Sequence, residues 1–292
     1  MPPNPKTIVV TGANRGIGLA ICRLLLSKST QRNQPLRLWA TSRAGKTLDL
    51  DPGSQHEIHY PQLDISSSSS IASLASQIRE EIPNGRLDVL INNAGVNLDN
   101  EYGPENARRT LEVNCWGTLE MCRTFLPLLK GKGLSGEGGK GEKSRIVTLS
   151  SVASSLNAYS PDLQTRFRSA STSLTLDDLS TLSSQYLHAV STHSEETSGF
   201  GPPGRSYSFS KALVNAFTLI LARENPDVLI NCCCPGWVAT EMGKLIGKPP
   251  KREEDGAKIP VRLAVGDIWG VTGGYWANGS VRSKEEGELR EW

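Results

Sequence analysis

The sequence has no long hydrophobic run. Among its 292 residues, no apolar stretch approaches the roughly 18 residues that a membrane-spanning helix needs. Met1–Pro5 is polar and proline-rich, and the apolar stretch Thr7–Gly12 that follows is too short for the core of a signal peptide. These features predict a cytoplasmic protein with no membrane partner.

The sequence also lacks a strong charge of either sign. It has 32 Lys and Arg against 30 Asp and Glu, a formal net charge of +2, and the two signs are interspersed. Proteins that bind nucleic acids usually concentrate Lys and Arg in a stripe or patch that neutralises phosphates. The sequence therefore indicates no nucleic-acid partner.

Patterns typical of disulfides and metal sites are missing as well. The six cysteines form no CxxC pair, and three of them are consecutive at Cys232–Cys234, where a strand would point neighbouring side chains to opposite faces. The four histidines have no partner at metal-ligand spacing. We therefore expect buried free thiols, no disulfide framework and no metal.

What the sequence does contain is an alternation of short apolar runs with amphipathic stretches. Runs without polar alternation are typical of parallel strands that are buried on both faces, and the stretches between them have apolar residues at helical spacing. This predicts an α/β protein, a doubly wound parallel sheet with helices on both faces, in one domain over residues 1–292. The expected strands are Lys6–Thr11, Arg37–Thr41, Glu57–Leu63, Leu87–Ile91, Arg145–Leu149, Val228–Cys233 and Val271–Trp276. The expected helices are Ile17–Ser27, a helix that is capped within Ser66–Ser70 and runs to about Glu81, Glu105–Leu129 and Ser208–Arg223.

Two segments interrupt this alternation. Gly131–Lys143 is rich in Gly, Lys and Glu, which is typical of a flexible surface loop. A longer insertion covers about residues 157–204. It contains the leucine-patterned stretch Leu174–Val190, which predicts a helix, and it closes with a Gly/Pro turn at Gly199–Gly204.

A glycine-rich loop, Thr11-Gly12-Ala13-Asn14-Arg15-Gly16-Ile17-Gly18, joins the first strand to the first helix. Glycines allow a tight turn and a close approach of the backbone to a pyrophosphate, and the start of the next helix offers free N–H groups. By itself such a loop can simply connect a strand to a helix. Its position at the first strand–helix turn favours a dinucleotide site.

Tyr207 and Lys211 are four residues apart in a predicted helix and therefore share one face. A phenol with a pKa of about 10 is a poor acid–base catalyst at neutral pH, and a neighbouring ammonium lowers that pKa because it favours the phenolate. The pair thus predicts a tyrosine acid whose pKa is lowered by lysine. In isolation, such a pair is more often an ordinary surface contact.

Together these motifs resemble those of the short-chain dehydrogenase/reductase family. In the family's order, the glycine loop is followed by Asn92-Asn93-Ala94-Gly95, Ser151, Tyr207-Ser208-Phe209-Ser210-Lys211 and Pro235-Gly236-Trp237-Val238, so the resemblance extends from residue 6 to 243. It implies a Rossmann-type fold and the catalytic set Asn114, Ser151, Tyr207 and Lys211.

The resemblance also implies a role for each member of this set. Tyr207 would donate a proton to the substrate oxygen, Lys211 would tune Tyr207 and hold the nicotinamide ribose, and Ser151 would orient the substrate oxygen. Asn114 would support a water chain to the lysine. Ser150 is adjacent to Ser151 and is the alternative serine, but the family's pattern favours the second of the two.

The residues after the second predicted strand bear on the choice of cofactor. NAD enzymes of this kind usually have an acidic residue there, and Ala40–Lys46 has none. Arg43 and Arg15 can instead bind a 2′-phosphate through charge-assisted hydrogen bonds, although two solvated surface arginines are the alternative. The predicted cofactor is NADP(H). Its expected contacts, of which the resemblance supplies Asp64 and Ile65 for adenine and Thr240 for the carboxamide, are Gly12, Asn14, Arg15, Gly16, Ile17, Gly18, Arg43, Asp64, Ile65, Asn93, Ala94, Gly95, Tyr207, Lys211, Pro235, Gly236, Val238 and Thr240.

The predicted activity is NADPH-dependent reduction of a ketone, aldehyde or quinone. The same residues would catalyse the reverse oxidation, and a non-catalytic cofactor sensor on this fold is the competing function. Substrate contacts are expected at Ser151, Tyr207 and Trp237, although Trp237 can equally be a packing residue, and Cys234 is interpreted as an inert thiol. The long insertion resembles the monomeric carbonyl reductase branch, which predicts a monomer; nothing in the sequence indicates which carbonyl compound is the substrate.

Overall fold

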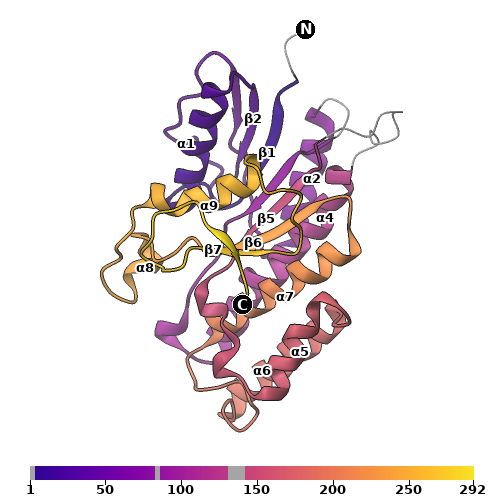
Figure 1. Cartoon of the computed structure of the whole chain (residues 1–292), viewed down its shortest axis with the longest axis vertical. Coiled ribbons are helices and arrows are strands. Elements are labelled where there is room, and N and C mark those ends of the chain that lie inside the picture. The colour runs from indigo at the N-terminus through magenta and orange to yellow at the C-terminus, as the bar shows by residue number, and fades with distance from the viewer. Residues whose placement is uncertain (1–3, 83–85, 131–141) are drawn as a thin grey trace.

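The computed structural model describes residues 4–82, 86–130 and 142–292, and within them the strands form one sheet (Figure 1). The strand order is β3-β2-β1-β4-β5-β6-β7-β8, so the chain reverses its direction of travel between β1 and β4. This confirms the doubly wound prediction. The strands are β1 (Lys6–Val10), β2 (Leu36–Ala40), β3 (His56–His59), β4 (Val89–Asn92), β5 (Arg145–Leu149), β6 (Leu229–Cys233), β7 (Tyr275–Ala277) and β8 (Glu288–Arg290).

The edge strand β8 departs from the prediction. β1 to β7 pair in parallel, whereas β8 pairs antiparallel to β7 and was not predicted. Its three residues are all exposed, so the strand has no apolar run that a sequence pattern could detect. The expected strand Glu57–Leu63 is also shorter than predicted, because β3 ends at His59 and only a bridge from Gln62 to Ser42 follows.

Helices cover both faces of the sheet. Side chains that alternate along β1 enter two separate cores: Ile8 and Val10 pack with α1 and α9, and Val9 packs with α2, α4 and α7. The helices are α1 (Gly16–Gln31), α2 (Ser68–Glu81), α3 (Pro104–Leu111), α4 (Thr118–Lys130), α5 (Pro161–Arg168), α6 (Leu176–Thr192), α7 (Ser206–Glu224), α8 (Glu241–Lys244) and α9 (Glu253–Val265).

The helix expected over Glu105–Leu129 is not continuous. The π-helical segment η3 (Glu112–Gly117) separates α3 from α4. Gly117 lies close to the segment that follows β3. A Cβ on Gly117 would be 2.2 Å from the Ile65 carbonyl oxygen. Hydrophobic spacing over the whole stretch still suggested one helix, because a single π turn shifts the pattern only slightly.

The insertion forms α5, the short 3₁₀ turn η6 (Ser169–Ser171) and α6, as predicted for its leucine-patterned part. α6 begins at a capping box, in which Thr175 Oγ1 accepts a bond from the Asp178 N–H and the Asp178 carboxylate accepts one from the Thr175 N–H. Phe167 and Leu182 are buried in the same core as Phe209 of α7. The insertion therefore lies against the helix that carries Tyr207 (Figure 1).

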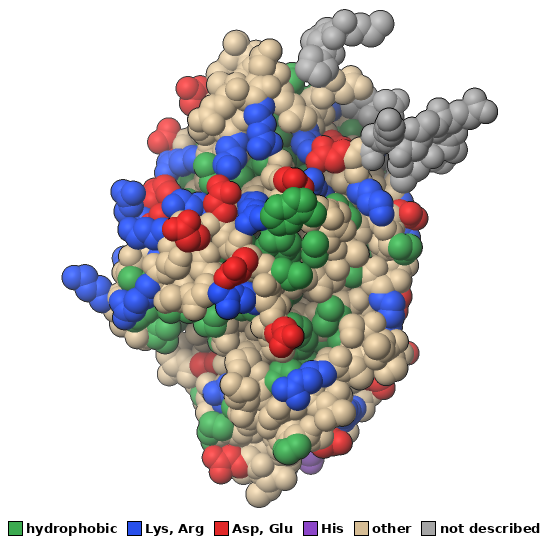
Figure 2. Space-filling view, in the orientation of Figure 1, with side chains coloured by type: hydrophobic (Ala, Val, Ile, Leu, Met, Phe, Trp, Pro, Cys, Tyr) green, Lys and Arg blue, Asp and Glu red, His purple; other side chains and the backbone are tan. Residues whose placement is uncertain are grey.

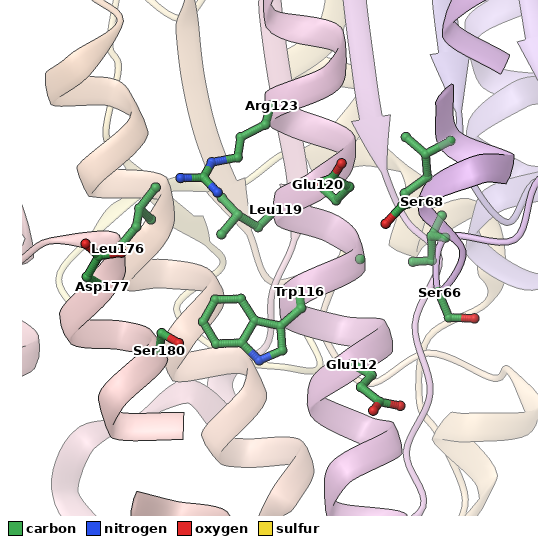
Figure 3. A pocket seen from close by; sticks show the side chains of 13 residues that line it. Ser66, Ser68, Glu112, Trp116, Leu119, Glu120, Arg123, Leu176, Asp177 and Ser180 are labelled. Atoms are coloured by element: carbon green, nitrogen blue, oxygen red, sulfur yellow. The ribbon is translucent and has the colours of Figure 1, made fainter. Parts of the chain in front are cut away.

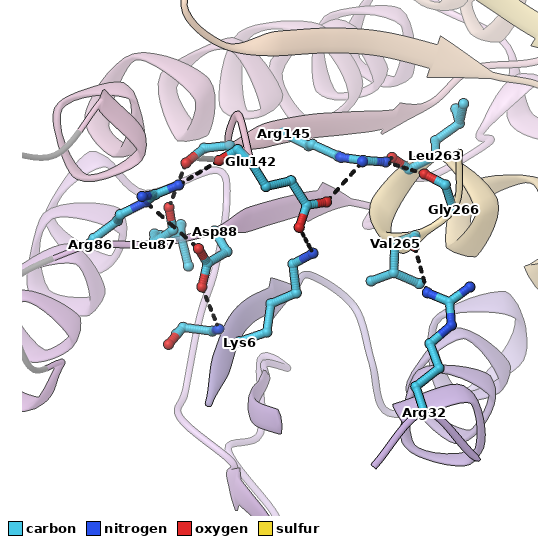
Figure 4. A network of polar contacts seen from close by, with 12 residues as sticks. Lys6, Arg32, Arg86, Leu87, Asp88, Glu142, Arg145, Leu263, Val265 and Gly266 are labelled. Carbon is cyan, nitrogen blue, oxygen red and sulfur yellow. Dashed lines mark hydrogen bonds and ion pairs between the residues drawn. The ribbon is translucent and has the colours of Figure 1, made fainter. Parts of the chain in front are cut away.

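A polar network joins the amino ends of the strands to the carboxyl end of α9 (Figure 4). The Arg145 guanidinium donates to the carbonyl oxygens of Leu263 (3.0 Å) and Gly266 (2.7 Å) and to the Glu142 carboxylate (2.9 Å). Lys6 pairs with the other oxygen of Glu142 at 2.8 Å. The network holds α9 against the sheet at the edge opposite the predicted site.

All six cysteines are buried and free, and the burial of Cys232 and Cys233 in β6 agrees with the apolar strand predicted there. In the described part of the chain, no group of His, Cys, Asp or Glu side chains is arranged to hold a metal ion. Nor does any helix in these segments combine the length and apolarity that crossing a membrane requires. Most of the expected Gly131–Lys143 loop lies outside the described residues.

Candidate active site

The predicted site residues gather at the carboxyl ends of β1, β4, β5 and β6. Because these strands are parallel neighbours in the sheet, the segments that follow them meet at one edge, next to the reversal between β1 and β4. Segments far apart in the sequence are thus brought together there: the glycine loop, Asn93–Gly95, Ser151 and Pro235–Gly236.

The glycine loop has the conformation that a dinucleotide site needs. Gly12 and Gly16 have φ angles of +64° and +58°, which favour glycine, and a Cβ on Gly18 would lie 2.2 Å from the Gly12 carbonyl oxygen. The Asn93 amide donates to the carbonyl oxygens of Thr11 (2.9 Å) and Gly12 (3.0 Å). Asn93 therefore fixes the loop from the neighbouring strand.

The start of α1 can accept an anion. Its N-cap residue, Arg15, makes no side-chain capping bond, and the first turn contains no acidic residue. The helix N-terminus consequently presents N–H groups beside a glycine cradle, an arrangement suited to a pyrophosphate. Thr11, which was not among the predicted contacts, supports the cradle because its hydroxyl accepts bonds from the N–H groups of Asn93 and Ala94, both at 3.0 Å.

The adjacent serines after β5 have different surroundings. The Ser150 hydroxyl is buried and donates to Asn215 Oδ1 at 2.5 Å. Ser151 is only half-buried, and its hydroxyl lies beside the Tyr207 phenol, whose ionised form it favours. The geometry thus favours Ser151 as the serine that can reach a substrate.

Tyr207 and Lys211 both lie in α7, as expected, with Lys211 Nζ 5.6 Å from the centroid of the tyrosine ring. Lys211 is 6% exposed and donates to the Leu149 carbonyl oxygen at 2.7 Å. This bond uses one of the three N–H groups of the ammonium, which leaves two for other acceptors.

The expected lowering of the Tyr207 pKa is wrong for the chain by itself. Burial of the phenol raises its pKa to about 12, and the neighbouring Ser151 hydroxyl only partly opposes this. Burial likewise lowers the pKa of Lys211 to about 8. Loss of solvation is the largest cause of both shifts, because both side chains lie in a poorly hydrated part of the protein.

Asn114 lies in η3 and is 1% exposed. Its amide oxygen accepts the Val96 N–H, and its amide nitrogen donates to the Val96 carbonyl oxygen, both at 2.8 Å, and to Ser210 Oγ at 3.0 Å. A Cβ on Gly95 would lie 3.1 Å from Asn114 Oδ1 and 3.8 Å from Lys211 Nζ. Asn114 is therefore close to Lys211, and it also holds the strand-to-helix segment at Val96.

The residues expected to bind the adenosine end lie around the glycine loop. Arg15 and Arg43 are exposed, and Arg15 forms an ion pair with Glu241 of α8. Asp64 accepts bonds from the Ser66 N–H (2.9 Å) and hydroxyl (2.6 Å), and these bonds, together with the charge of Arg43, hold the pKa of that carboxyl below its usual value. The two arginines remain accessible to a phosphate.

The segment after β6 is held by a buried lysine that sequence reasoning missed. Lys251 is 1% exposed and donates to the Pro235 carbonyl oxygen at 2.8 Å. Gly236 has φ +87°, and a Cβ there would lie 2.8 Å from Lys251 Nζ. Val238 bridges to Lys251, and the Thr240 hydroxyl accepts the Gly243 N–H to cap α8. A lysine in the charged stretch Lys248–Glu254 gave no sequence signal of burial.

Trp237, between β6 and α8, is half-buried. Its indole N–H donates to the Gly243 carbonyl oxygen at 2.8 Å, and Arg282 lies over its ring at 5.8 Å. On the adjacent side of the molecule, Figure 2 shows Lys and Arg side chains gathered where α8 lies. The exposed basic residues at the end of α8 and in the segment after it include Lys244, Lys248 and Arg252.

A groove of about 510 Å³ lies outside this cluster, between α2, α4 and α6 (Figure 3). The Trp116 side chain of η3 and the Arg123 side chain of α4 extend toward α6, near Ser180 and Leu176. None of the four predicted catalytic residues lines it, and Ile65 is its one predicted cofactor contact. The groove is thus distinct from the predicted catalytic centre.

Comparison with known proteins agrees with this arrangement. The family model described as short chain dehydrogenase matches residues 6–161. A (+)-neomenthol dehydrogenase of Arabidopsis thaliana is 31% identical over 287 residues, which cover 89% of this chain and 92% of that protein. Carbonyl reductase (NADPH) 1 of Homo sapiens is 33% identical over 278 residues, covering 88% and 90%.

A solved structure shares the same architecture. Salutaridine reductase from Papaver somniferum superimposes with a TM-score of 0.75 at 26% identity, over 92% of this chain and 99% of that one. The similarity therefore extends over most of the chain.

Proposed function

Because this chain belongs to the short-chain dehydrogenase family, we propose that it is an NADPH-dependent carbonyl reductase, which converts a ketone, aldehyde or quinone to an alcohol. The observation that carries the proposal is the meeting of Ser151, Tyr207 and Lys211 beside the glycine loop. Relatives named carbonyl reductase (NADPH) and neomenthol dehydrogenase support the reaction class.

The described residues fit NADP(H). The glycine loop and the start of α1 would hold the pyrophosphate, and Arg15 and Arg43 would hold the 2′-phosphate. The predicted nicotinamide contacts are Lys211, Pro235, Gly236, Val238 and Thr240. When bound, the reduced cofactor supplies the hydride that adds to the carbonyl carbon.

Residues of the chain would bind the carbonyl oxygen of the substrate and supply its proton. Ser151 would donate a hydrogen bond to the carbonyl oxygen and hold it beside Tyr207. Tyr207 would transfer its phenolic proton to that oxygen as the carbon–oxygen π bond breaks, so that a C–H and an O–H bond form together. Lys211 would stabilise the resulting phenolate with its ammonium, and Asn114 would support the path by which water returns a proton.

Reduction requires the protonated phenol of Tyr207. Burial raises its pKa to about 12, so the phenol is protonated at neutral pH and can act as the acid.

A screen of ketones, aldehydes and quinones with NADPH and NADH in parallel tests the proposal. We expect NADPH oxidation with at least one carbonyl class and a clear preference for NADPH. Tyr207→Phe should reduce turnover by a factor of at least about 1,000, since it removes the acid while NADPH affinity stays close to wild type. Full activity of this variant would refute the mechanism, and cofactor binding without any turnover would favour a sensor.

We also propose a monomeric cytoplasmic protein with no nucleic-acid partner. The insertion supports the monomer, because α5 and α6 lie against α7. The interspersed charges of the sequence support the absence of a nucleic-acid partner.

A further inference from the structure

The helix that carries Tyr207 begins without a capping side chain of its own. The N-cap residue of α7 is Arg205, which makes no side-chain capping bond. An arginine side chain has only donors, so it cannot accept the free N–H groups of a first helical turn. Acceptors for this turn must therefore come from another part of the chain.

Asp99 supplies these acceptors from 107 residues before Ser206 in the sequence. One carboxylate oxygen accepts the Ser206 N–H at 3.1 Å, and the other accepts the N–H of Tyr207 itself at 3.0 Å. Asp99 lies in the 3₁₀ turn η2 (Asp99–Glu101), between the Asn92–Gly95 motif and α3. A negative charge at this position also interacts favourably with the dipole of α7.

The segment that carries Asp99 is fixed on both sides. At one end, Asn114 binds both backbone groups of Val96. At the other end, the Tyr102 hydroxyl donates to Glu195 of the insertion at 2.6 Å, and Glu195 is 2% exposed. Asp99 is thus held between two buried anchors, one at η3 and one in the insertion.

We propose that Asp99 is a positioning residue for the reaction: it fixes the first turn of α7, and hence Tyr207, and it places a negative charge at the start of that helix. The proposal rests on the reductase function proposed above. The charge adds to the effect of burial and raises the pKa of Tyr207 further. Asp99 therefore affects both the position of Tyr207 and the pH at which its phenol ionises.

The other groups around Tyr207 and Asp99 do not supply this negative charge. Cys234 faces Tyr207 from the end of β6, but burial raises the pKa of its thiol, so that it is neutral at neutral pH. Lys211 on the same helix is a cation below its pKa of about 8. The remaining titratable groups, which face Asp99, are Arg205 and Tyr186.

The test compares Asp99→Asn with wild type, using the ketone and alcohol pair that serves wild type best. Asn keeps one acceptor but loses the charge. In alcohol oxidation with NADP⁺, the limb of kcat/KM that rises as Tyr207 ionises should move to lower pH by roughly 0.5 to 1 unit, the effect of one charge at an effective dielectric near 20. At pH 7, kcat for reduction should fall about tenfold, as expected for loss of about one charge-assisted hydrogen bond.

A second readout needs no cofactor. In the chain alone, amide hydrogen exchange at the first turn of α7 should be faster in Asp99→Asn, because the second N–H loses its acceptor. Asp178→Asn is the matched control, since it removes the carboxylate of the α6 capping box and should leave the pH profile unchanged.

A pH profile of Asp99→Asn that superimposes on the wild-type profile would overturn the proposal, even if kcat were lower, because the role would then be structural only. If Asp99→Asn does not fold, Asp99→Ser offers a hydroxyl cap without charge, and the same shift to lower pH is expected. Failure of both variants to fold, with Asp178→Asn folded, would also overturn it. Absence of turnover by the wild-type protein would instead refute the proposed function.

Discussion

Tyr207 and Lys211 illustrate how burial competes with charge at a single residue. Spacing in the sequence placed them on one helix face, and simple Coulomb reasoning suggested a phenol of lowered pKa. In the folded chain, burial raises the Tyr207 pKa to about 12 and lowers that of Lys211 to about 8. The pair is therefore suited to hold a proton on tyrosine, and Lys211 becomes the group that titrates near physiological pH.

The pH dependence of reduction should report Lys211. Its folded-state pKa is lowered, so the ammonium is present below about pH 8 and is lost as the pH rises through that value. If the ammonium stabilises the phenolate left by proton transfer, kcat/KM for reduction should be flat between roughly pH 6 and 7 and fall tenfold per unit well above pH 8. Steady-state rates with saturating NADPH would measure this.

The assignment of this pH dependence to Lys211 can be tested with a control substitution. Lys211→Met should remove the limb near pH 8 along with most of the activity, whereas Lys258→Met, at a half-buried lysine of α9 outside the predicted site, should keep the wild-type profile. A wild-type rate that stays constant to pH 9.5 would show that the lysine charge is not needed.

Other residues differed in how far the sequence could identify them. Ser151 was preferred over Ser150 from a family pattern, and the structure offers a physical reason, because the Ser150 hydroxyl is already bonded to Asn215. No sequence pattern indicated a role for Asp99. Its partners lie more than 100 residues away, and an aspartate in a polar loop is indistinguishable from a solvated one.

At the scale of elements, strands and helices differ in how well they can be predicted from the sequence. Buried parallel strands such as β1 and β5 are apolar runs that end within a residue of the predicted bounds. α9 was not predicted, because Pro260 and several charges interrupt its pattern, although its buried residues cover one face of the sheet. Its placement depends on tertiary contacts at its carboxyl end.

Arg145 provides a test of those contacts. Arg145→Ala would remove the donors to the Leu263 and Gly266 carbonyl oxygens and leave the Glu142 carboxylate paired with Lys6. We expect a loss of about 2–4 kcal/mol in the free energy of unfolding, because the guanidinium is mostly buried. Urea unfolding followed by circular dichroism would measure it.

The control for this experiment is Arg108→Ala, which removes an exposed arginine that pairs only with Glu105 and Glu112 on its own helical stretch. Its unfolding midpoint should remain close to wild type. Equal effects of the two substitutions would show that α9 does not depend on the Arg145 contacts.

At the scale of the whole molecule, the insertion bears on assembly. Sedimentation velocity should give one species near 31.6 kDa over a wide range of concentration, because α5 and α6 cover α7 with their own apolar side chains. Leu182→Glu, on the buried face of α6, should loosen the insertion and promote association.

Gln185→Glu places the same charge on the exposed face of α6 and should leave the protein monomeric. A dimer or tetramer of the wild-type protein that does not depend on concentration would contradict the role given to the insertion.

The sequence by itself determined the doubly wound fold, the glycine loop, the catalytic candidates and the helical insertion, because each depends on local patterns or on ordered motifs. Only the tertiary structure decided the break at η3, the antiparallel edge strand, the direction of the Tyr207 pKa shift and the partners of Asp99 and Lys251. These features depend on burial and on contacts between distant segments. Solvation of a side chain and the identity of its neighbours exist only once the chain has folded.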